Sequence, residues 1–175
     1  MPKLTEEEIN RLAPIIPAFG RNNRKPMDER ACKDGESDRT EFEHLIHPGD
    51  EDGEPLQFIS LTVEEVETLK QRGGKWAEKS FLWVIDHETI KIIREQNANR
   101  LRTHKPEYVC HTNLTGNSHA YVGGEIYFCE DGRKFINPFS DRYGDPTNAQ
   151  WVAAKEYFEK VGYTPLIDIL EFLTT

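Results

Sequence analysis

The sequence has few cysteines and no long hydrophobic run. Its three cysteines, Cys32, Cys110 and Cys129, have spacings that fit neither a disulfide framework nor a zinc ribbon. We interpret Cys110 and Cys129 as small core thiols, although a bridge between them is geometrically conceivable. No stretch approaches the roughly 20 apolar residues that cross a bilayer, and the amino terminus lacks the pattern of a signal peptide. We therefore expect no membrane association and a protein that is cytoplasmic, or exported without a classical signal.

Positive charge is also scarce. The chain has 22 Lys and Arg residues against 31 Asp and Glu residues, which gives a formal net charge of −9 at pH 7. Generic nucleic-acid binders draw most of their affinity from a positive field, so this balance argues against that class. The usual phosphate-loop, dinucleotide-binding, hydrolase and zinc-protease motifs are absent from the sequence. His44 and His47 could share a helical face, but no third ligand has metal spacing nearby, so we expect no metal site.

Length and composition indicate one domain over residues 1–175. Hydrophobic residues make up 37% of the chain and charged residues 30%, so a core can form although one long segment is strongly polar. That segment, residues 20–55, is predicted to be a charged loop that is either mobile or functional. The chemically distinctive part of the chain is residues 107–162.

Three capping boxes predict three helices. Each box pairs a threonine with a Glu or Gln three residues later, an arrangement that satisfies the first free N–H groups of a helix. The pairs are Thr5 with Glu8, Thr62 with Glu65, and Thr147 with Gln150. The corresponding helices should end before Pro14, at Gly73 and at Gly162, because proline and glycine stop helix propagation.

Hydrophobic spacing predicts further elements before residue 100. Residues 56–61 and 81–85 have the pattern of strands, the second of them buried. Ile90, Ile92 and Ile93 are interpreted as the apolar face of a helix capped near Asp86.

The second half of the chain favours β-structure. Residues 107–112, 120–131 and 133–139 are predicted to form an antiparallel meander, with Asp131 and Gly132 in a tight hairpin turn. The segment TPLIDILEFL at the carboxyl end fits either a strand or a terminal helix. The predicted fold is α+β, a small antiparallel sheet with flanking helices.

His111 is the first candidate for chemistry, within the stretch VCHTNLTGNSHAYVGGEIYF. The sequence places it at a strand end, followed by Thr112 and Thr115, where scaffolds often present working groups. A histidine near neutral pH can accept or release a proton, as general acid–base catalysis requires. The alternative is a structural histidine that is bonded to a local carbonyl.

Glu125 is the second candidate, on a neighbouring predicted strand. The preceding pair Gly123–Gly124 weakens a strand, which suggests a bulge or the close approach of a ligand or another backbone. Alternation places Glu125 on the same face as Tyr127. If that face points inward, Glu125 is a partly buried carboxylate that needs a partner such as His111 or Arg142. If the face points outward, Glu125 is a solvated edge residue.

The connection INPFSDRYGDP supplies a third group of candidates. The planar fork of Arg142 suits a phosphate or carboxylate, and Tyr143 could stack on a ring. The alternative is simple structural turning before the helix that follows. The candidate catalytic residues are therefore His111, Glu125, Arg142 and Tyr143, and the candidate substrate-binding residues are Thr112, Thr115, Gly123, Gly124 and Ser140.

Four short motifs occur in one order over about residues 107–162: HTNLTG, AYVGGEIYF, GRKFIN and SDRYGDP. This order resembles carboxy-terminal domains of bacterial polymorphic toxins and the conserved part of plant IQ-motif calmodulin-binding proteins. In those proteins a His-Ser/Thr-x-Leu turn precedes an Ala-x-x-Gly-Glu strand, a glycine-turn hairpin and a Ser-Gly-His-Tyr-x-Pro or Ser-Gly-Arg-Tyr segment. Here Asp141 stands where the pattern usually has glycine, and Arg142 replaces the commoner histidine.

The resemblance implies a toxin- or effector-like enzyme that acts on a nucleotide-containing substrate. Transfer from NAD, the candidate dinucleotide, would use Arg142 on phosphate, Tyr143 on the ring and Glu125 to orient a nucleophile. One alternative is a non-enzymatic interaction or structural protein with a protein partner, in which His111, Glu125 and Arg142 form a satisfied network. Another is a metal-independent ribonuclease, which needs a positive cleft.

Overall fold

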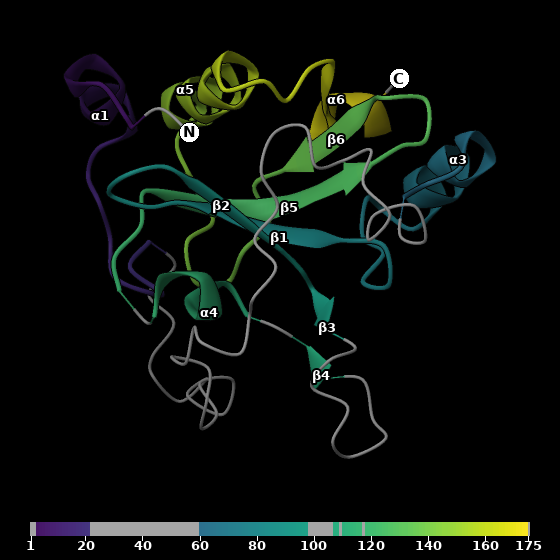
Figure 1. Cartoon of the computed structure of the whole chain (residues 1–175), viewed down its shortest axis with the longest axis horizontal. Helices are drawn as coiled ribbons and strands as arrows, with labels where there is room; N and C mark the ends of the chain where they lie inside the picture. Colours follow the sequence, from purple (N-terminus) through teal and green to yellow (C-terminus); the bar gives the residue numbers. More distant parts are fainter. Residues whose placement is uncertain (1–2, 22–59, 98–106, 109, 117, 175) are drawn as a thin grey trace.

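The computed structural model contains a five-stranded sheet with the strand order β2-β1-β5-β6-β7 (Figure 1). The described residues are 3–21, 60–97, 107–108, 110–116 and 118–174. The strands of the sheet are β1 (Phe81–Ile85), β2 (Ile90–Arg94), β5 (Val122–Phe128), β6 (Lys134–Asn137) and β7 (Leu166–Asp168). Neighbouring strands are antiparallel except β6 and β7, which are parallel. The α+β fold predicted from the sequence is confirmed.

The helices lie on both sides of this sheet. They are α1 (Glu6–Leu12), α3 (Val63–Gln71), α4 (His111–Thr115), α5 (Asn148–Lys160) and α6 (Ile169–Leu173). All three capping boxes are confirmed, since each threonine side chain accepts from the N3 backbone and each N3 side chain accepts in return. Gly73 and Gly162 follow α3 and α5 with φ angles of 70° and 112°, backbone conformations that favour glycine.

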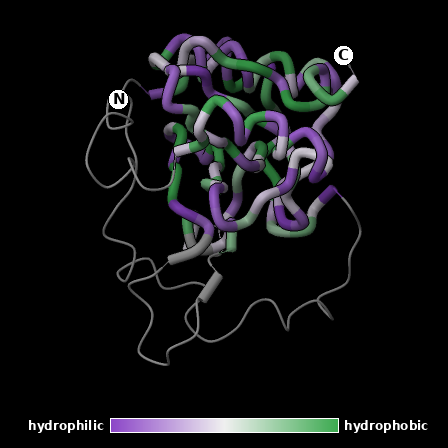
Figure 2. Tube along the Cα trace, turned by 90° about the vertical axis from the view of Figure 1, so that its right-hand side faces the viewer, coloured by the Kyte–Doolittle hydropathy of each residue, from purple (hydrophilic) through white to green (hydrophobic). Residues whose placement is uncertain are grey.

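One face of the sheet carries the largest apolar cluster. Its side chains come from alternate positions of β1, β2 and β5, and they pack against α1 and α5 (Figure 1). Trp83 lies at the centre, stacked on Trp151 with ring centroids 6.1 Å apart and in an edge contact with Phe158 at 4.8 Å. Hydrophobic and hydrophilic residues are interleaved along the helices that cover this face (Figure 2). This is the pattern of amphipathic elements that bury one side.

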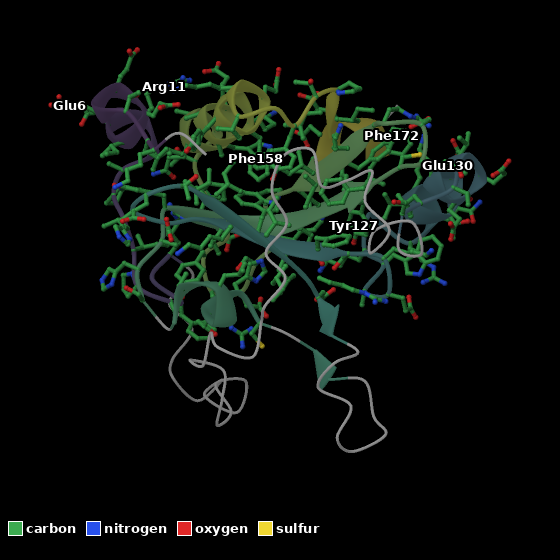
Figure 3. All side chains as sticks on the ribbon, viewed as in Figure 1. Glu6, Arg11, Tyr127, Glu130, Phe158 and Phe172 are labelled. Carbon is green, nitrogen blue, oxygen red and sulfur yellow. The ribbon has the colours of Figure 1, made fainter. Side chains whose placement is uncertain are left out.

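The opposite face carries two smaller apolar clusters. One joins Leu82 and Val84 of β1 to Leu114 of α4. The other includes Tyr127 and Phe135, beside α3 and α6. In Figure 3 Phe158 lies between α5 and the sheet, whereas Tyr127 lies on the other side. Alternate residues of a strand share a face, so Gly123, Glu125 and Tyr127 of β5 all belong to this second face. The second face therefore contains a carboxyl among its apolar side chains.

Three sequence predictions are wrong, two of them around β2 and the third at His111. Residues 90–94, predicted as a helix, form strand β2, which pairs with β1 in the register Trp83 with Ile92. Asp86 caps no helix; its Oδ1 accepts from the backbone N–H groups of Glu88 and Thr89 in the β1–β2 turn. His111, predicted at a strand end, is the first residue of helix α4.

Other predictions are confirmed in part. The turn at Gly132 joins β5 to β6 with a φ of 94°. The segment 107–108 is a strand, but it pairs with β3 (Gln96–Asn97) as strand β4 (Glu107–Tyr108) in a separate two-stranded sheet. The carboxyl end forms both predicted elements in succession, β7 and then α6.

Several expectations fall outside the described residues, including the charged loop at 22–55, Cys32, and positions 56–59 of the first predicted strand. Leu61, at the end of that predicted strand, makes one parallel bridge to Cys129. Cys110 is half-buried and Cys129 is buried, and no disulfide joins them. Within the described ranges, no helix has the length and apolar character of a membrane span.

Gly124 provides a test of the packing around β5. A Cβ at this position would lie 2.0 Å from the carbonyl oxygen of Asn137 and 2.7 Å from the Trp83 ring. We expect Gly124→Ala to lower the free energy of unfolding by about 3 kcal/mol or more, because overpacking a rigid core forces the backbone to shift. Gly132→Ala is the matched control, since a Cβ there meets nothing within 4 Å and only the positive φ is unfavourable. Urea denaturation of both variants measures the difference, and equal losses would contradict this account.

Candidate functional site

Helix α4 places His111 against the middle of β5. The imidazole is buried, and its Nε2 lies 2.7 Å from the carbonyl oxygen of Gly124, to which it donates. A Cβ built on Gly123 would lie 3.2 Å from the His111 ring and 3.1 Å from the Cβ of Tyr143. The glycine pair therefore does permit close approach, as the sequence suggested. The groups that approach are side chains of the protein at Gly123, and the Asn137 backbone carbonyl and the Trp83 ring at Gly124.

Tyr143 is held by hydroxyl contacts below the sheet. Its ring is fully buried, and its phenol donates to the carbonyl oxygen of Ser118 at 2.5 Å. The hydroxyl of Thr115 lies 2.9 Å from the same phenol. The backbone N–H of Tyr143 donates to Oγ of Ser140 at 3.0 Å. The residue that the sequence offered for stacking on a ligand is thus enclosed by Thr115, Ser118 and Ser140.

Arg142 and Thr112 are also buried. The Arg142 guanidinium lies over the Phe19 ring, 5.4 Å from its centroid. Arg21 binds the segment that carries Arg142, because its Nη1 donates to the carbonyl oxygen of the next residue, Tyr143, at 3.0 Å. The Oγ1 of Thr112 has no hydrogen-bond partner among the described residues. The structure thus gathers His111, Ser140 and Tyr143 around Gly123, with Thr115 bonded to the Tyr143 phenol.

Burial sets the charge of His111. Loss of hydration lowers its pKa to about 4, the bond to the Gly124 carbonyl raises it, the Arg142 charge lowers it and Asp141 raises it. The imidazole is therefore neutral at pH 7. It donates from Nε2 and does not serve there as a charged acid.

Glu125 belongs to a neighbouring but different group. Its partner is Asn137, which lies opposite it on the neighbouring strand β6. The Asn137 Nδ2 donates to Oε1 of Glu125 at 3.1 Å, and the backbone N–H of Glu125 donates to Oδ1 of Asn137 at 3.0 Å. The sequence-based candidates for this role were His111 and Arg142. The contacts instead join the carboxyl to an amide for which the sequence predicted no role in chemistry.

A second carboxyl lies near Glu125. Glu95 follows β2, where its backbone N–H bonds to Ser80 and its side chain accepts from the Ser80 hydroxyl. Burial and the Glu95 charge raise the pKa of Glu125 to about 7, whereas the Asn137 bond and the Lys75 charge lower it. Burial likewise raises the pKa of Glu95, against the lowering effects of Ser80 and Lys75. Two acids with raised pKa values thus lie within the electrostatic influence of one exposed lysine.

The connection between α3 and β1 borders this acid pair. The carbonyl oxygen of Gly74 accepts from Nδ2 of Asn137 at 3.4 Å, and the backbone N–H of Trp76 donates to the Tyr127 phenol at 2.9 Å. Burial, and next the Glu125 charge, raise the pKa of that phenol. Lys75 lies between Gly74 and Trp76 in the sequence. The backbone of Gly74 is bonded to Asn137 of β6 and that of Trp76 to Tyr127 of β5. Four parts of the fold contribute to the site: the α3–β1 connection, the residue after β2, β5 and β6.

The arrangement suits proton transfer better than metal binding. A carboxyl with a pKa near 7 can accept or give up a proton at neutral pH, and a second carboxyl nearby keeps that value high. Among the described residues, no three His, Cys, Asp or Glu side chains are grouped as metal ligands. Sequence reasoning missed Glu95, Ser80 and Lys75. The helix predicted at 90–93 concealed Glu95, because only a strand at this position brings residue 95 beside residue 80.

Comparisons of the chain with protein-family models, with curated proteins and with solved structures found no match. The resemblance to bacterial polymorphic toxins and plant calmodulin-binding proteins therefore stays a prediction that rests on the four motifs quoted above. The motif residues HTNLTG and SDRYGDP contribute to the His111 group, and GGE and FIN contribute Glu125 and Asn137.

Replacing His111 tests whether its role is structural. His111→Ala leaves the Gly124 carbonyl without its donor in a buried position, so we expect the free energy of unfolding to fall by about 1–3 kcal/mol. His119→Ala is the matched control, because His119 is exposed on the loop after α4. Chemical denaturation at pH 7 measures both. An unchanged stability in His111→Ala, equal to that of the control, would contradict a structural role.

Proposed function

We propose that this protein is a toxin- or effector-like enzyme that acts on a nucleotide-containing substrate, with Glu125 as its acid–base group. The observation that carries the proposal is the state of Glu125, a carboxyl that is 9% exposed, held by Asn137 and raised in pKa to about 7. Such a displaced value requires burial and a neighbouring acid, and strongly perturbed carboxyls are frequent at catalytic sites.

Glu125 and Glu95 are suited to act together in one proton transfer, one as the ionised carboxylate and the other as the protonated acid. The Glu95 charge raises the pKa of Glu125, and carboxyls that interact strongly lose their protons in two separate steps, so that one is ionised while the other still carries a proton. The Asn137 amide holds one oxygen of Glu125 through Nδ2, which fixes the direction of the carboxyl. A fixed base whose pKa lies near the working pH is the most effective kind.

NAD is the substrate that we propose to test first. Transfer from NAD breaks the bond between ribose and nicotinamide while an acceptor hydroxyl forms a bond to the same ribose carbon. Nicotinamide leaves as a neutral molecule, and the proton of the acceptor hydroxyl passes to the Glu125 carboxylate. This assignment keeps the role that the resemblance implied for Glu125. It leaves phosphate and ring recognition without Arg142 and Tyr143, because the Arg142 guanidinium lies against the Phe19 ring and the Tyr143 phenol is bonded to Ser118.

A second candidate function is a non-enzymatic interaction or structural protein with a protein partner. It is favoured by the contacts of His111 and Tyr143, which are buried and bonded to protein groups. Metal-independent RNA cleavage has less support from the geometry, because a buried His111 with a pKa of about 4 is uncharged at neutral pH.

Glu125→Gln tests the enzyme proposal directly. The amide keeps an oxygen that accepts from Asn137 but cannot take up a proton, so we expect nicotinamide release from NAD to fall by about 100-fold or more. Release is followed by chromatography on purified protein, and growth arrest is scored in bacteria that express the same variants. Glu159→Gln is the matched control, because Glu159 is exposed on α5 across the sheet.

Full turnover by Glu125→Gln would remove Glu125 from the chemistry. If the unaltered protein turns over neither NAD, ATP nor RNA and causes no growth arrest, the enzyme proposal is lost and the interaction protein takes its place.

The pH dependence of stability provides an independent test of the Glu125 environment. The folded pKa of about 7 exceeds the ordinary value of 4.5, so the folded form holds this proton more tightly than the unfolded form. Stability is therefore lost as the pH rises from 4.5 through 7, by on the order of 3 kcal/mol in all. Glu125→Gln removes this loss, so the variant should gain stability relative to the unaltered protein at pH 8 and little at pH 5. Urea denaturation at both pH values measures this difference, and a gain equal at the two pH values would contradict the raised pKa.

A further inference from the structure

The proposed substrate needs recognition groups near Glu125 that Arg142 and Tyr143 do not provide. Tyr143 is 0% exposed, and the Arg142 guanidinium lies against Phe19. A nucleotide reaching Glu125 would have to meet side chains that are open to solvent. Within the described part of the chain, the exposed Lys75 and the half-buried Phe139 fit this requirement.

Lys75 and Phe139 lie together although 64 positions separate them in the sequence. The Lys75 ammonium lies over the Phe139 ring, 5.1 Å from its centroid. Lys75 comes from the α3–β1 connection, and Phe139 follows the end of β6. Their contact therefore joins the two segments that border the acid pair.

Both residues are tied to Glu125 through Asn137. The backbone N–H of Phe139 donates to Oδ1 of Asn137 at 3.0 Å, while Nδ2 of the same amide donates to Glu125. The carbonyl before Lys75, that of Gly74, also accepts from this Nδ2. The Lys75 charge acts on both Glu125 and Glu95. One buried amide thus fixes the acid and the two segments that carry the cation and the ring.

We propose that Lys75 and Phe139 recognise the nucleotide, with the Lys75 ammonium on a phosphate and the Phe139 ring stacked on the base. This inference rests on the proposed function, and it assigns the recognition groups of the same site. An ammonium binds phosphate as a point charge, and an aromatic ring offers a stacking surface to any base. The contact keeps the cation and the ring close enough for one nucleotide to reach both, with the base on the ring face that the ammonium does not cover.

Binding measurements on substituted proteins test the recognition pair. Titration calorimetry is performed on the full chain carrying Glu125→Gln, so that turnover does not disturb binding, with NAD, AMP and adenosine as probes. We expect Lys75→Met to weaken NAD and AMP about tenfold or more while leaving adenosine unchanged, because adenosine has no phosphate. Phe139→Leu should weaken all three about tenfold, because each contains the adenine ring.

Lys70→Met is the matched control. Lys70 also lies over an aromatic ring, 5.3 Å from the centroid of Phe172, but it belongs to helix α3 and not to the segments that Asn137 joins. It should leave binding unchanged, and the melting temperatures of all variants should stay close to that of the parent. A merely structural contact between Lys75 and Phe139 would lower the melting temperature and leave the three affinities alike.

The outcomes separate this inference from the proposed function. Unchanged affinities in Lys75→Met and Phe139→Leu, with turnover still dependent on Glu125, overturn the recognition pair alone. Weakened binding in both variants, in a protein whose turnover does not need Glu125, supports the recognition pair and overturns the proposed acid–base role. Failure of the parent to bind any of the three probes overturns both.

Discussion

The fourfold bonding of the Asn137 amide is the interaction on which the site depends. Its oxygen accepts from the backbone of Glu125 and Phe139, and its nitrogen donates to the Glu125 carboxyl and the Gly74 carbonyl. A side-chain amide has two donor hydrogens and two acceptor lone pairs, so this buried group is fully satisfied. One side chain therefore joins β5, β6 and the α3–β1 connection and directs the carboxyl between them.

The two faces of the sheet use burial in different ways. The face under α1 and α5 is apolar throughout, with Trp83 stacked on Trp151, and its role is stability. The other face has two smaller apolar clusters, and Glu125 lies between Gly123 and Tyr127 along β5. A carboxyl in that position lowers stability at neutral pH, since burial favours its protonated form. Local departures from good packing of this kind are frequent at functional sites, which is one ground for the proposed role of Glu125.

Burial acts in opposite directions on the two titratable groups of the second face. It lowers the pKa of His111 to about 4 and raises that of Glu125 to about 7, because in both cases the neutral form is favoured. The charges acting on His111 come from Arg142 and Asp141, and those acting on Glu125 come from Glu95 and Lys75. The two residues that look like partners in the sequence thus belong to different electrostatic environments.

Local signals determined much of the fold from the sequence alone. A capping box depends on residues three positions apart, and a hairpin turn on two adjacent residues, so α1, α3, α5 and the turn at Gly132 could be predicted without a partner. A short apolar run such as residues 90–94 fits a helix or a strand equally. These residues form a strand because they pair with the edge of β1. The same pairing placed Glu95 beside Ser80, and contacts across 64 positions placed Lys75 over Phe139. The sequence by itself determined the residue types and the helices and turns that depend on near neighbours. The partners of Glu125 depended on strand pairing, which no local pattern specifies.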